Sequence, residues 1–438
     1  MPTIDSQQGY SPERVEALLH EQTPLLSDSV LRGFVEPFFL RRDEFLAPLE
    51  KQETPLYLFE PEVLRRRSER FKVAFQKHFK NTVFYYAVKS NNYPEVARVL
   101  TTTGFGLDVS SGLELKMALG LDTQSIIFSG PGKTRAELEM AVTASERVTV
   151  LIDSFHELQI LGEIACSRQQ DIRVGVRLTT RVDGLWRKFG IPPETLARFM
   201  KEVKCFPYIH FQGLQFHTSW NLNAQAQLDF ILLLKKVLSQ FTDEDLRRIT
   251  FIDVGGGYWP EQGEWLQPAA TKAGLLRKAM ELSPENDNNH YFQSACSIED
   301  FAGHLGWAIK NHIFPLIPDC HICFEPGRWL CNDAMHLLMT VIDKKSDNVV
   351  ITDAGTNAVG WERFETDYFP VLNLSRPALS EKPCNVLGSL CTPHDVWGYS
   401  YWGEGIEIGD ILLIPTQGAY TYSLMQNFIK PLPEVVVV

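Results

Sequence analysis

Short apolar runs alternate along the chain with longer stretches in which apolar residues recur every three to four positions. Eight such runs lie between residues 83 and 328, and each except the last is followed by a helix-like stretch. The runs are VFYYAVK, FGLDVS, SIIFSG, VTVLIDS, IRVGVRL, FQGLQFHTS, RITFIDVGGG and HICFEPGR. Strands that alternate with helices form a parallel sheet, and eight units close a barrel. The pattern therefore predicts an α/β fold built on a TIM-like (β/α)8 barrel.

The pattern changes after residue 328. The runs MHLLMTVIDKK, NVVITDAG, CNVLG and DILLIPTQG are separated by turns rather than by helices, which predicts a C-terminal all-β sandwich or barrel. The N-terminal segment, including GFVEPFFLRR and TPLYLF, has a similar character and is expected to contribute strands to it. We therefore expect an N-terminal segment over 1–55, a barrel over 56–328 and a β domain over 329–438. Residues 259–298 resemble an inserted loop or helical excursion.

Composition and charge exclude several classes of protein. The chain has 438 residues, of which 44% are hydrophobic and 22% charged, as in an ordinary soluble protein. Its net charge of −12 argues against a nucleic-acid partner. No apolar run is long enough for a bilayer, and the N-terminal residues lack the pattern of a signal peptide. The eight scattered cysteines suit a reducing cytoplasm, which is the expected location.

Polar residues recur where the predicted strands end. The C-terminal rim of a (β/α)8 barrel is where active sites are built. Its candidates here are Lys89, Asp108, Ser129, Asp153, Arg177, His217, Gly255, Gly256, Gly257 and Glu325. Their coincidence at successive strand ends predicts an active site at this rim.

Lys89 follows six apolar or aromatic residues in VFYYAVKSNN. One interpretation is a lysine at a strand end whose ammonium reaches water. The other is a lysine retained for its amine, whose pKa is lowered by burial towards use as a nucleophile. This stretch alone does not decide between the two interpretations. The polar residues at the ends of the other predicted strands favour a lysine retained for its amine.

Two glycine-containing segments predict a phosphate site. In IDVGGGY, Gly255–Gly257 directly follow a strand, so that backbone N–H groups can approach an anion. In EPGR, Gly327 and Arg328 add donors from the neighbouring loop, and barrels often bind phosphate after strands seven and eight. The alternative is that the three glycines form only a flexible turn.

The remaining rim residues suggest what carries the phosphate. A buried Glu325 needs a cationic partner, and a protonated pyridine nitrogen would serve. Phosphate, pyridinium and a lysine amine are the three attachment points of pyridoxal phosphate. His217 could cover one face of the ring, although alone it would be read as a core histidine.

Two other motifs do not carry chemistry. FSGPGKT resembles a nucleotide-binding loop, but the glycine that such a loop requires is replaced by Ile127. Cys320 and Cys323 have metal-like spacing without a second pair, so no metal is expected.

The order of motifs resembles the fold-type III pyridoxal-phosphate decarboxylases, which include diaminopimelate and ornithine decarboxylases, with alanine racemase as a distant relative. The resemblance runs from about residue 55 to the C-terminus through YAVKSN, GLDVSSGLEL, GPGKTRAEL, IDSFHEL, KFGI, QFHTS, IDVGGGY, EPGR, GSLCTPHD and GAY. It implies that Lys89 forms the Schiff base, His217 stacks on the ring, and Glu325 meets its nitrogen. Phosphate would be held by Gly257, Gly327, Arg328 and Tyr420. We expect Asp108, Arg177, Gly255 and Gly256 to complete the cofactor site.

The same resemblance implies a head-to-tail homodimer with shared active sites, in which Cys391 and Asp395 enter the partner's site. Cys391 is then a second catalytic residue, an acid that protonates the carbanion. Glu325 favours decarboxylation over racemisation, because the alanine racemases place an arginine at that position.

Thr392 departs from the family pattern, because an acidic residue for the far end of the substrate usually follows the cysteine. Candidates for substrate binding are Arg363, Tyr368, Arg376, Thr392, His394 and Asp395. Arginines without the acid suggest a substrate with a neutral or anionic far end, such as a citrate-capped diamino acid in siderophore biosynthesis. The alternatives are diaminopimelate decarboxylase, an amino-acid racemase and a non-catalytic regulatory homologue.

Overall fold

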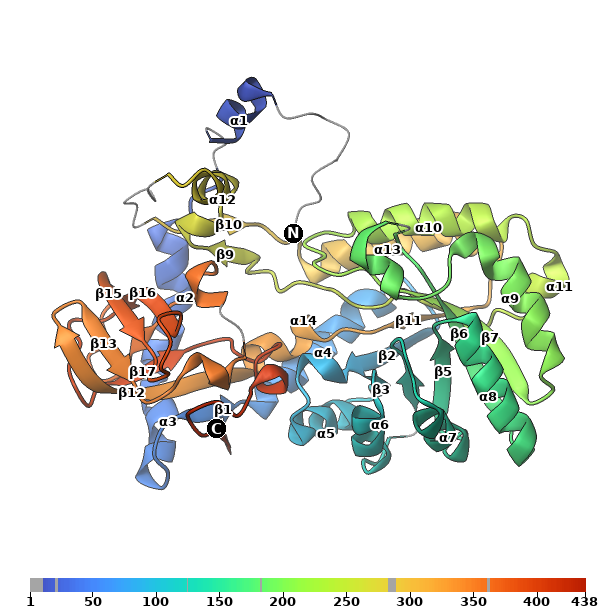
Figure 1. The fold of residues 1–438 in the computed structure, drawn as a ribbon, viewed down its shortest axis with the longest axis horizontal. Coiled ribbons are helices and arrows are strands. Elements are labelled where there is room, and N and C mark those ends of the chain that lie inside the picture. The colour runs from blue at the N-terminus through green and yellow to red at the C-terminus, as the bar shows by residue number, and fades with distance from the viewer. Residues whose placement is uncertain (1–10, 20–22, 124, 182, 283–288, 361–362) are drawn as a thin grey trace.

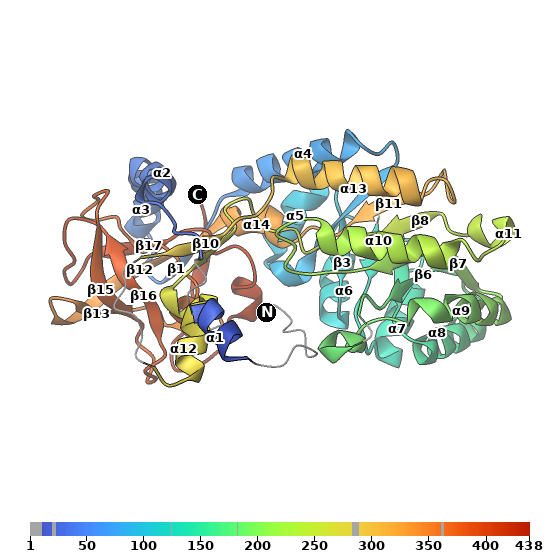
Figure 2. The same cartoon turned by 90° about the horizontal axis from the view of Figure 1, so that it is seen from above.

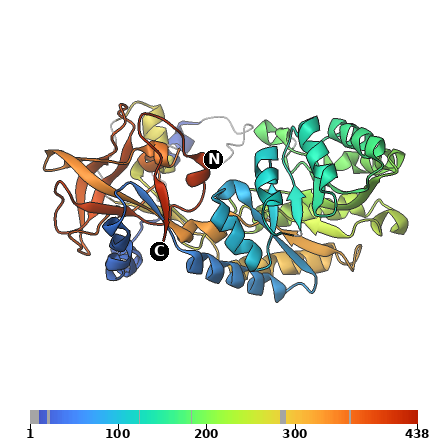
Figure 3. The same cartoon turned by 90° about the horizontal axis from the view of Figure 1, so that it is seen from below.

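Two bodies of β-structure lie side by side in the computed structural model, a closed barrel and a mixed sheet (Figure 1). Two further views show the same arrangement (Figures 2 and 3). The structure describes residues 11–19, 23–123, 125–181, 183–282, 289–360 and 363–438. None of the helices in these ranges combines the length and apolar character that a bilayer crossing requires.

The barrel consists of the eight strands that the apolar runs predicted, so the predicted fold class is confirmed. Its strands are β2 (Thr82–Ala87), β3 (Gly106–Val109), β4 (Ile126–Phe128), β5 (Val148–Ile152), β6 (Ile172–Leu178), β7 (Ile209–Phe216), β8 (Phe251–Asp253) and β11 (His321–Phe324). Each strand pairs in parallel with its neighbours, and β11 closes the barrel by pairing with both β8 and β2. All eight C-terminal ends therefore meet at one rim.

Helices cover the outside of the barrel. They are α4 (Pro61–Gln76), α5 (Pro94–Thr102), α6 (Gly112–Leu119), α7 (Arg135–Thr143), α8 (Phe155–Arg168), α9 (Leu196–Glu202), α10 (Gln225–Leu238), α11 (Asp243–Leu246) and α13 (Ile298–His312). Ser111, Thr134 and Ser154 cap the first turns of α6, α7 and α8 by accepting a backbone N–H three residues on. A cap of this kind contributes about 1 kcal/mol, so these side chains mark where each helix begins.

The mixed sheet has the order β13-β15-β16-β14-β17-β12-β1-β18. Its strands are β1 (Leu56–Phe59), β12 (Met335–Ser346), β13 (Val349–Thr352), β14 (Leu372–Asn373), β15 (Glu381–Leu387), β16 (Val396–Trp402), β17 (Ile411–Ile414) and β18 (Glu434–Val437). β1 pairs antiparallel with β12 and parallel with β18. The expected barrel start at residue 56 therefore falls on a strand of the mixed sheet, and the chain crosses to the barrel only after Phe59. The short helix α14 (Arg328–Cys331) leads back from the barrel to this sheet.

The prediction that GFVEPFFLRR forms a strand is wrong. This segment lies in helix α2 (Asp28–Leu40), which Ser27 caps, and which follows α1 (Pro12–Leu19) and precedes α3 (Arg42–Leu46). Leu31 and Val35, four residues apart, are buried on one face of α2. Apart from Glu36, the run is uncharged from Gly33 to Leu40, so periodicity alone could not separate a helix from a strand.

The insertion after β8 joins the barrel to the mixed sheet and the N-terminal helices. It contains β9 (Glu264–Leu266), α12 (Lys272–Ala279) and β10 (Tyr291–Gln293), and β9 pairs antiparallel with β10. Leu266 bridges to Asp367 in the β domain, and Tyr291 bridges to Leu25. Residues 283–288 of this insertion lie outside the described residues.

Candidate active site

Lys89 and Asp108 form an ion pair at the rim of the barrel. Lys89 lies on the 3₁₀ helix η2 (Val88–Ser90) immediately after β2, and Asp108 lies on the adjacent strand β3. The distance from Lys89 Nζ to Asp108 Oδ2 is 3.1 Å, and Ser129 Oγ donates to Asp108 Oδ1 at 2.5 Å. Asp108 is fully buried, whereas the Lys89 side chain is 34% exposed. The Lys89 amine is therefore accessible at the rim, while the buried Asp108 carboxylate holds it in place by the ion pair.

The charges around Lys89 oppose the effect of burial on its pKa. Burial lowers the pKa of the amine, but the negative charges of Asp108 and Glu325 outweigh burial and raise it above its ordinary value. The sequence-based interpretation of a pKa lowered by burial is therefore wrong for the protein without cofactor, in which Lys89 is an ammonium.

Glu325 and His217 meet beside the same space. Glu325 is 2% exposed, and His217 Nδ1 lies 3.6 Å from Glu325 Oε2. The Gly256 N–H donates to His217 Nδ1 at 3.1 Å, which requires an unprotonated Nδ1. Burial lowers the pKa of His217 well below its ordinary value, and the positive charges of Lys89 and Arg177 lower it further. His217 is therefore a neutral imidazole, suited to lie flat against an aromatic ring.

The three glycines bring the ends of β7, β8 and β11 together. Gly255 and Gly257 have φ angles of +70° and +84°, which favour glycine. A Cβ on Gly256 would lie 2.2 Å from the carbonyl oxygen of Glu325. A side chain at Gly256 would push β8 away from the Glu325 backbone, so the sequence GGG is a condition for this site.

These groups surround a cavity of about 150 Å³. It is lined by Ala87, Lys89, His217, Ser219, Trp220, Gly257, Trp259, Glu325, Gly327, Arg328 and Tyr420. An amine, a carboxylate, a neutral ring and a guanidinium beside glycine backbone are the groups that pyridoxal phosphate requires. The residues present therefore fit this cofactor. Arg177 is 8% exposed, with its guanidinium 4.4 Å from the Phe189 ring centroid, and it is not among the residues that line the cavity.

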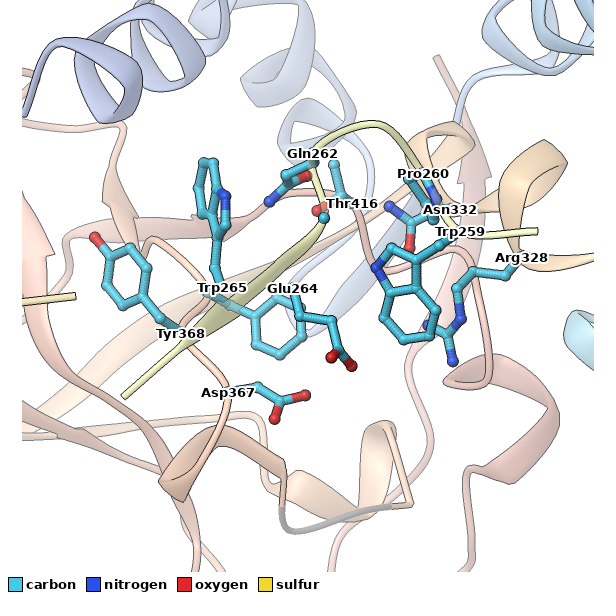
Figure 4. A pocket seen from close by; sticks show the side chains of 12 residues that line it. Trp259, Pro260, Gln262, Glu264, Trp265, Arg328, Asn332, Asp367, Tyr368 and Thr416 are labelled. Carbon is cyan, nitrogen blue, oxygen red and sulfur yellow. The ribbon is translucent and has the colours of Figure 1, made fainter. Parts of the chain in front are cut away.

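Aromatic rings surround Arg328 at the edge of the cavity. Its guanidinium lies 4.4 Å from the Trp259 centroid, 4.8 Å from that of Tyr420 and 5.9 Å from that of Trp220. The Trp220 indole donates to Glu264 at 2.7 Å. Figure 4 shows the Trp259 ring beside Arg328, and Glu264 as another of the residues that line a small neighbouring cavity. The sequence assigned no role to Trp220 or to the insertion. The hydrogen bond from Trp220 to Glu264, which lies in the insertion, shows that the insertion supports the aromatic residues around Arg328.

The loop after β15 carries Cys391 away from this cavity. Cys391 and His394 are exposed and Thr392 is half-buried, and none of the three lines the cavity of its own chain. Asp395 is instead buried, accepting from the Thr356 and Leu390 N–H groups at 2.7 and 2.6 Å. Asp395 therefore shapes the loop that presents Cys391. Its side chain is buried in its own chain, whereas the sequence predicted that it enters the partner's site.

An acid that sequence reasoning missed lies beside this loop. His394 Nδ1 is 2.8 Å from Glu365 Oε1, although 29 residues separate them in the sequence. Glu365 ends the 3₁₀ helix η9 (Arg363–Glu365), and the side chain of Arg363 lies outside what the structure describes. No sequence signal marked Glu365, since it follows no motif.

Two further candidates for substrate binding have partners inside the β domain. Tyr368 is 2% exposed, donates to Glu381 at 2.8 Å and stacks on His290 at 3.5 Å between centroids. It borders the small cavity of Figure 4 rather than that of Lys89. Arg376 Nε lies 3.2 Å from Asp410. The structure thus does not bring Tyr368 or Arg376 to the cavity within one chain.

Metal-ligating residues do not gather in the described part of the chain, where no group of three His, Cys, Asp or Glu side chains could hold an ion. Cys320 and Cys323 are buried free thiols.

The barrel and the groups at its rim define a class of enzyme that uses pyridoxal phosphate. A family model described as "Pyridoxal-dependent decarboxylase, pyridoxal binding domain" matches residues 63–332. The chain belongs to these pyridoxal-dependent decarboxylases, and it is a carboxy-lyase that acts on an amino-acid substrate with pyridoxal phosphate as its cofactor.

Individual relatives are distant but cover most of the chain. Diaminopimelate decarboxylase of Archaeoglobus fulgidus is 26% identical over 392 residues, covering 86% of this chain and 85% of the relative. A Staphylococcus aureus protein named 2-[(L-alanin-3-ylcarbamoyl)methyl]-2-hydroxybutanedioate decarboxylase is 24% identical, with 79% and 85% covered. The crystal structure of diaminopimelate decarboxylase from Helicobacter pylori in complex with L-lysine superimposes with a TM-score of 0.72 at 23% identity, covering 90% and 94%. This likeness shows the shared fold.

Proposed function

We propose that the enzyme decarboxylates an amino acid whose far end carries a neutral or anionic group, such as a diamino acid capped with a hydroxy acid like citrate. The observation that carries this proposal is Thr392, which stands after Cys391 where the family usually has an acid. A buried ammonium without a carboxylate partner is an uncompensated charge that costs several kcal/mol. Glu365 does not simply replace the missing acid, because it is paired with His394.

The name of the Staphylococcus aureus relative supports the same chemistry. It describes an alanine unit joined through a carbamoyl group to a hydroxybutanedioate, so the far end of that protein's substrate carries carboxylates. Diaminopimelate is the second candidate substrate, because the Archaeoglobus fulgidus relative bears that name.

We propose the following roles for the residues of the cavity. Bound pyridoxal phosphate supplies an acceptor for the electron pair released when the bond between Cα and the carboxylate breaks. Lys89 holds the cofactor, the neutral His217 covers one face of its ring, and Glu325 keeps a proton on the ring nitrogen. The phosphate group is bound by Gly257, Gly327, Arg328 and Tyr420.

We also infer that two copies of the chain share their active sites. Support comes from Cys391, which is exposed and does not line the cavity of its own chain. Cys391 of a second copy would then return a proton to Cα. Its loop is held by Asp395, so the thiol is presented on a defined backbone.

The substrate proposal is tested by comparing kcat/KM for ornithine, lysine, diaminopimelate and citrate-capped diamino acids on the same enzyme. We expect the capped compounds to be preferred. The matched variant Thr392→Asp should lose this preference and gain activity on ornithine, because it restores a partner for an ammonium. A wild-type enzyme that prefers ornithine or lysine would overturn the proposal, and a preference for diaminopimelate would assign the second candidate.

A further inference from the structure

A second buried carboxyl group lies inside the barrel, one layer below Glu325. Asp253 ends β8 and is fully buried. Its Cα partners are Gln215 on β7 and Cys323 on β11. Paired residues of a parallel sheet point to the same face, and Glu325 comes two residues after Cys323, directly after the end of β11. Gln215, Asp253, Cys323 and Glu325 therefore all point into the barrel.

Two buried oxygen atoms of this cluster have no hydrogen-bond donor among the described residues. Asp253 Oδ1 accepts from the Gly255 N–H at 2.8 Å, but Oδ2 has no partner in the described part of the chain. Gln215 Oε1 on the neighbouring strand is also without a partner there, while Gln215 Nε2 faces both oxygens of Glu325 at 3.4 Å. Buried oxygens are costly to leave unsatisfied. One proton on Asp253 would convert an acceptor into the missing donor.

Charge leads to the same conclusion. Asp108, Asp253 and Glu325 are three carboxyl groups in one buried region, and Lys89 is the cation that pairs with Asp108. Burial raises the pKa of Asp253 well above its ordinary value, and the negative charges of Glu325 and Asp108 raise it further against the opposing Gly255 N–H.

The other titratable groups at this level do not neutralise Asp253. Burial also raises the pKa of Tyr85 on β2 and of Cys323 on β11, so both are neutral. A bound pyridine nitrogen could balance Glu325, but Asp253 takes part in none of the ion pairs found among the described residues.

We propose that Asp253 is a positioning residue, kept as a neutral carboxylic acid whose single hydroxyl donates to the neighbouring Glu325 and so fixes the Glu325 carboxylate. The consequence is that Glu325 alone carries the charge offered to the ring nitrogen. This consequence rests on the proposed role of Glu325, whereas the protonation of Asp253 does not.

Infrared difference spectroscopy of the full chain tests the protonation, both without cofactor and with pyridoxal phosphate bound. Wild type at neutral pH should show the carbonyl stretch of a protonated carboxylic acid that is missing in Asp253→Asn. Carboxyl-labelled aspartate should shift this band in the unmodified sequence, which shows that the band belongs to an aspartate, and its loss in Asp253→Asn then assigns it to Asp253. Asp410→Asn is the matched control, because Asp410 is paired with Arg376 and its removal should leave the band unchanged. Absence of a band assigned to Asp253 would overturn the proposal.

Kinetics test the positioning role. Asp253→Asn keeps a donor and changes no charge, so kcat should stay within about threefold of wild type. Asp253→Leu keeps an apolar volume without a donor, and kcat should fall about 10- to 100-fold with a smaller change in KM. If Asp253→Asn is as impaired as Asp253→Leu, the residue acts as a charge and the proposal is wrong. The two failures are distinguishable, because a wild-type rate in Glu325→Gln would overturn the role of Glu325 and not the protonated Asp253.

Discussion

Lys89 Nζ lies 3.1 Å from Asp108 Oδ2, and this pair holds the amine at the barrel rim before any cofactor arrives. Since Asp108 raises the pKa of Lys89, Asp108→Asn should lower that pKa. The measurement is the pH dependence of labelling of Lys89 by an amine-specific reagent in cofactor-free protein, read by mass spectrometry. The midpoint should move to lower pH in Asp108→Asn and far less in Ser129→Ala, which keeps the charge. An unchanged midpoint in Asp108→Asn would contradict the pairing.

Glu325→Gln should slow decarboxylation far more than it weakens cofactor binding. The substitution removes the charge proposed to retain a proton on the ring nitrogen, and electrostatic stabilisation of this kind is worth about 3–4 kcal/mol. We expect kcat to fall by about two to three orders of magnitude. The affinity for pyridoxal phosphate, measured by absorbance titration, should change only a few-fold. A rate close to wild type would show that another group governs the ring nitrogen.

Mixing inactive Lys89→Ala with inactive Cys391→Ala should restore activity. In a head-to-tail dimer, one of the two sites of each heterodimer regains both residues, so random exchange returns about a quarter of all sites. Activity after mixing should therefore approach that fraction, with subunit exchange followed by mass spectrometry. If exchange occurs without recovery, Cys391 acts within its own chain or outside the chemistry.

Trp220 should support cofactor binding although its backbone has an unfavourable left-handed conformation. Its φ of +58° is left-handed, which costs a non-glycine residue about 1 kcal/mol or more, so Trp220→Gly should not destabilise the fold through its backbone. The same variant removes a ring beside Arg328 and should weaken binding of pyridoxal phosphate several-fold in a fluorescence titration. Trp220→Phe should lose less, because it keeps a ring while removing the donor to Glu264. Trp307, an exposed tryptophan on α13, provides the control variant Trp307→Phe.

Glu60 should make stability depend on acidic pH. Burial raises the pKa of Glu60, but hydrogen bonds from His336 and Arg41 outweigh burial and lower it from 4.5 to about 2. Because the folded pKa lies below the unfolded one, the stabilisation is complete above about pH 4.5 and is lost as the pH falls towards 2. At neutral pH a shift of this size corresponds to about 3 kcal/mol.

The measurement for Glu60 is the difference in Tm between wild type and Glu60→Gln across a pH series. The difference should be constant at neutral pH and should shrink as the pH falls from about 5 to about 3. A difference that grows on acidification would contradict the lowered pKa.

The sequence alone determined the barrel and much of the cofactor cavity. Buried parallel strands are apolar on both faces, so each one stands out from the helices between them, and eight successive alternations leave few other folds. Lys89 and Glu325 could be identified because a charged residue at the end of an apolar strand is conspicuous. The glycines of IDVGGGY could be identified because three in succession directly follow an apolar strand. The structure adds that close backbone packing forbids a Cβ at Gly256.

Only the tertiary structure decided which distant side chains meet. The helix α2 was misread because its apolar residues are too closely spaced to show a clear period, and its state depends on the surface against which it packs. The contact of Trp220 with Glu264 and the pairing of Glu365 with His394 join segments that no local pattern connects. The protonation expected of Asp253 depends on the residues that β7 and β11 place beside it. The burial of a side chain, the charges around it and its hydrogen-bond donors depend on its neighbours in space. For these residues, those neighbours are distant in the sequence and cannot be identified from it.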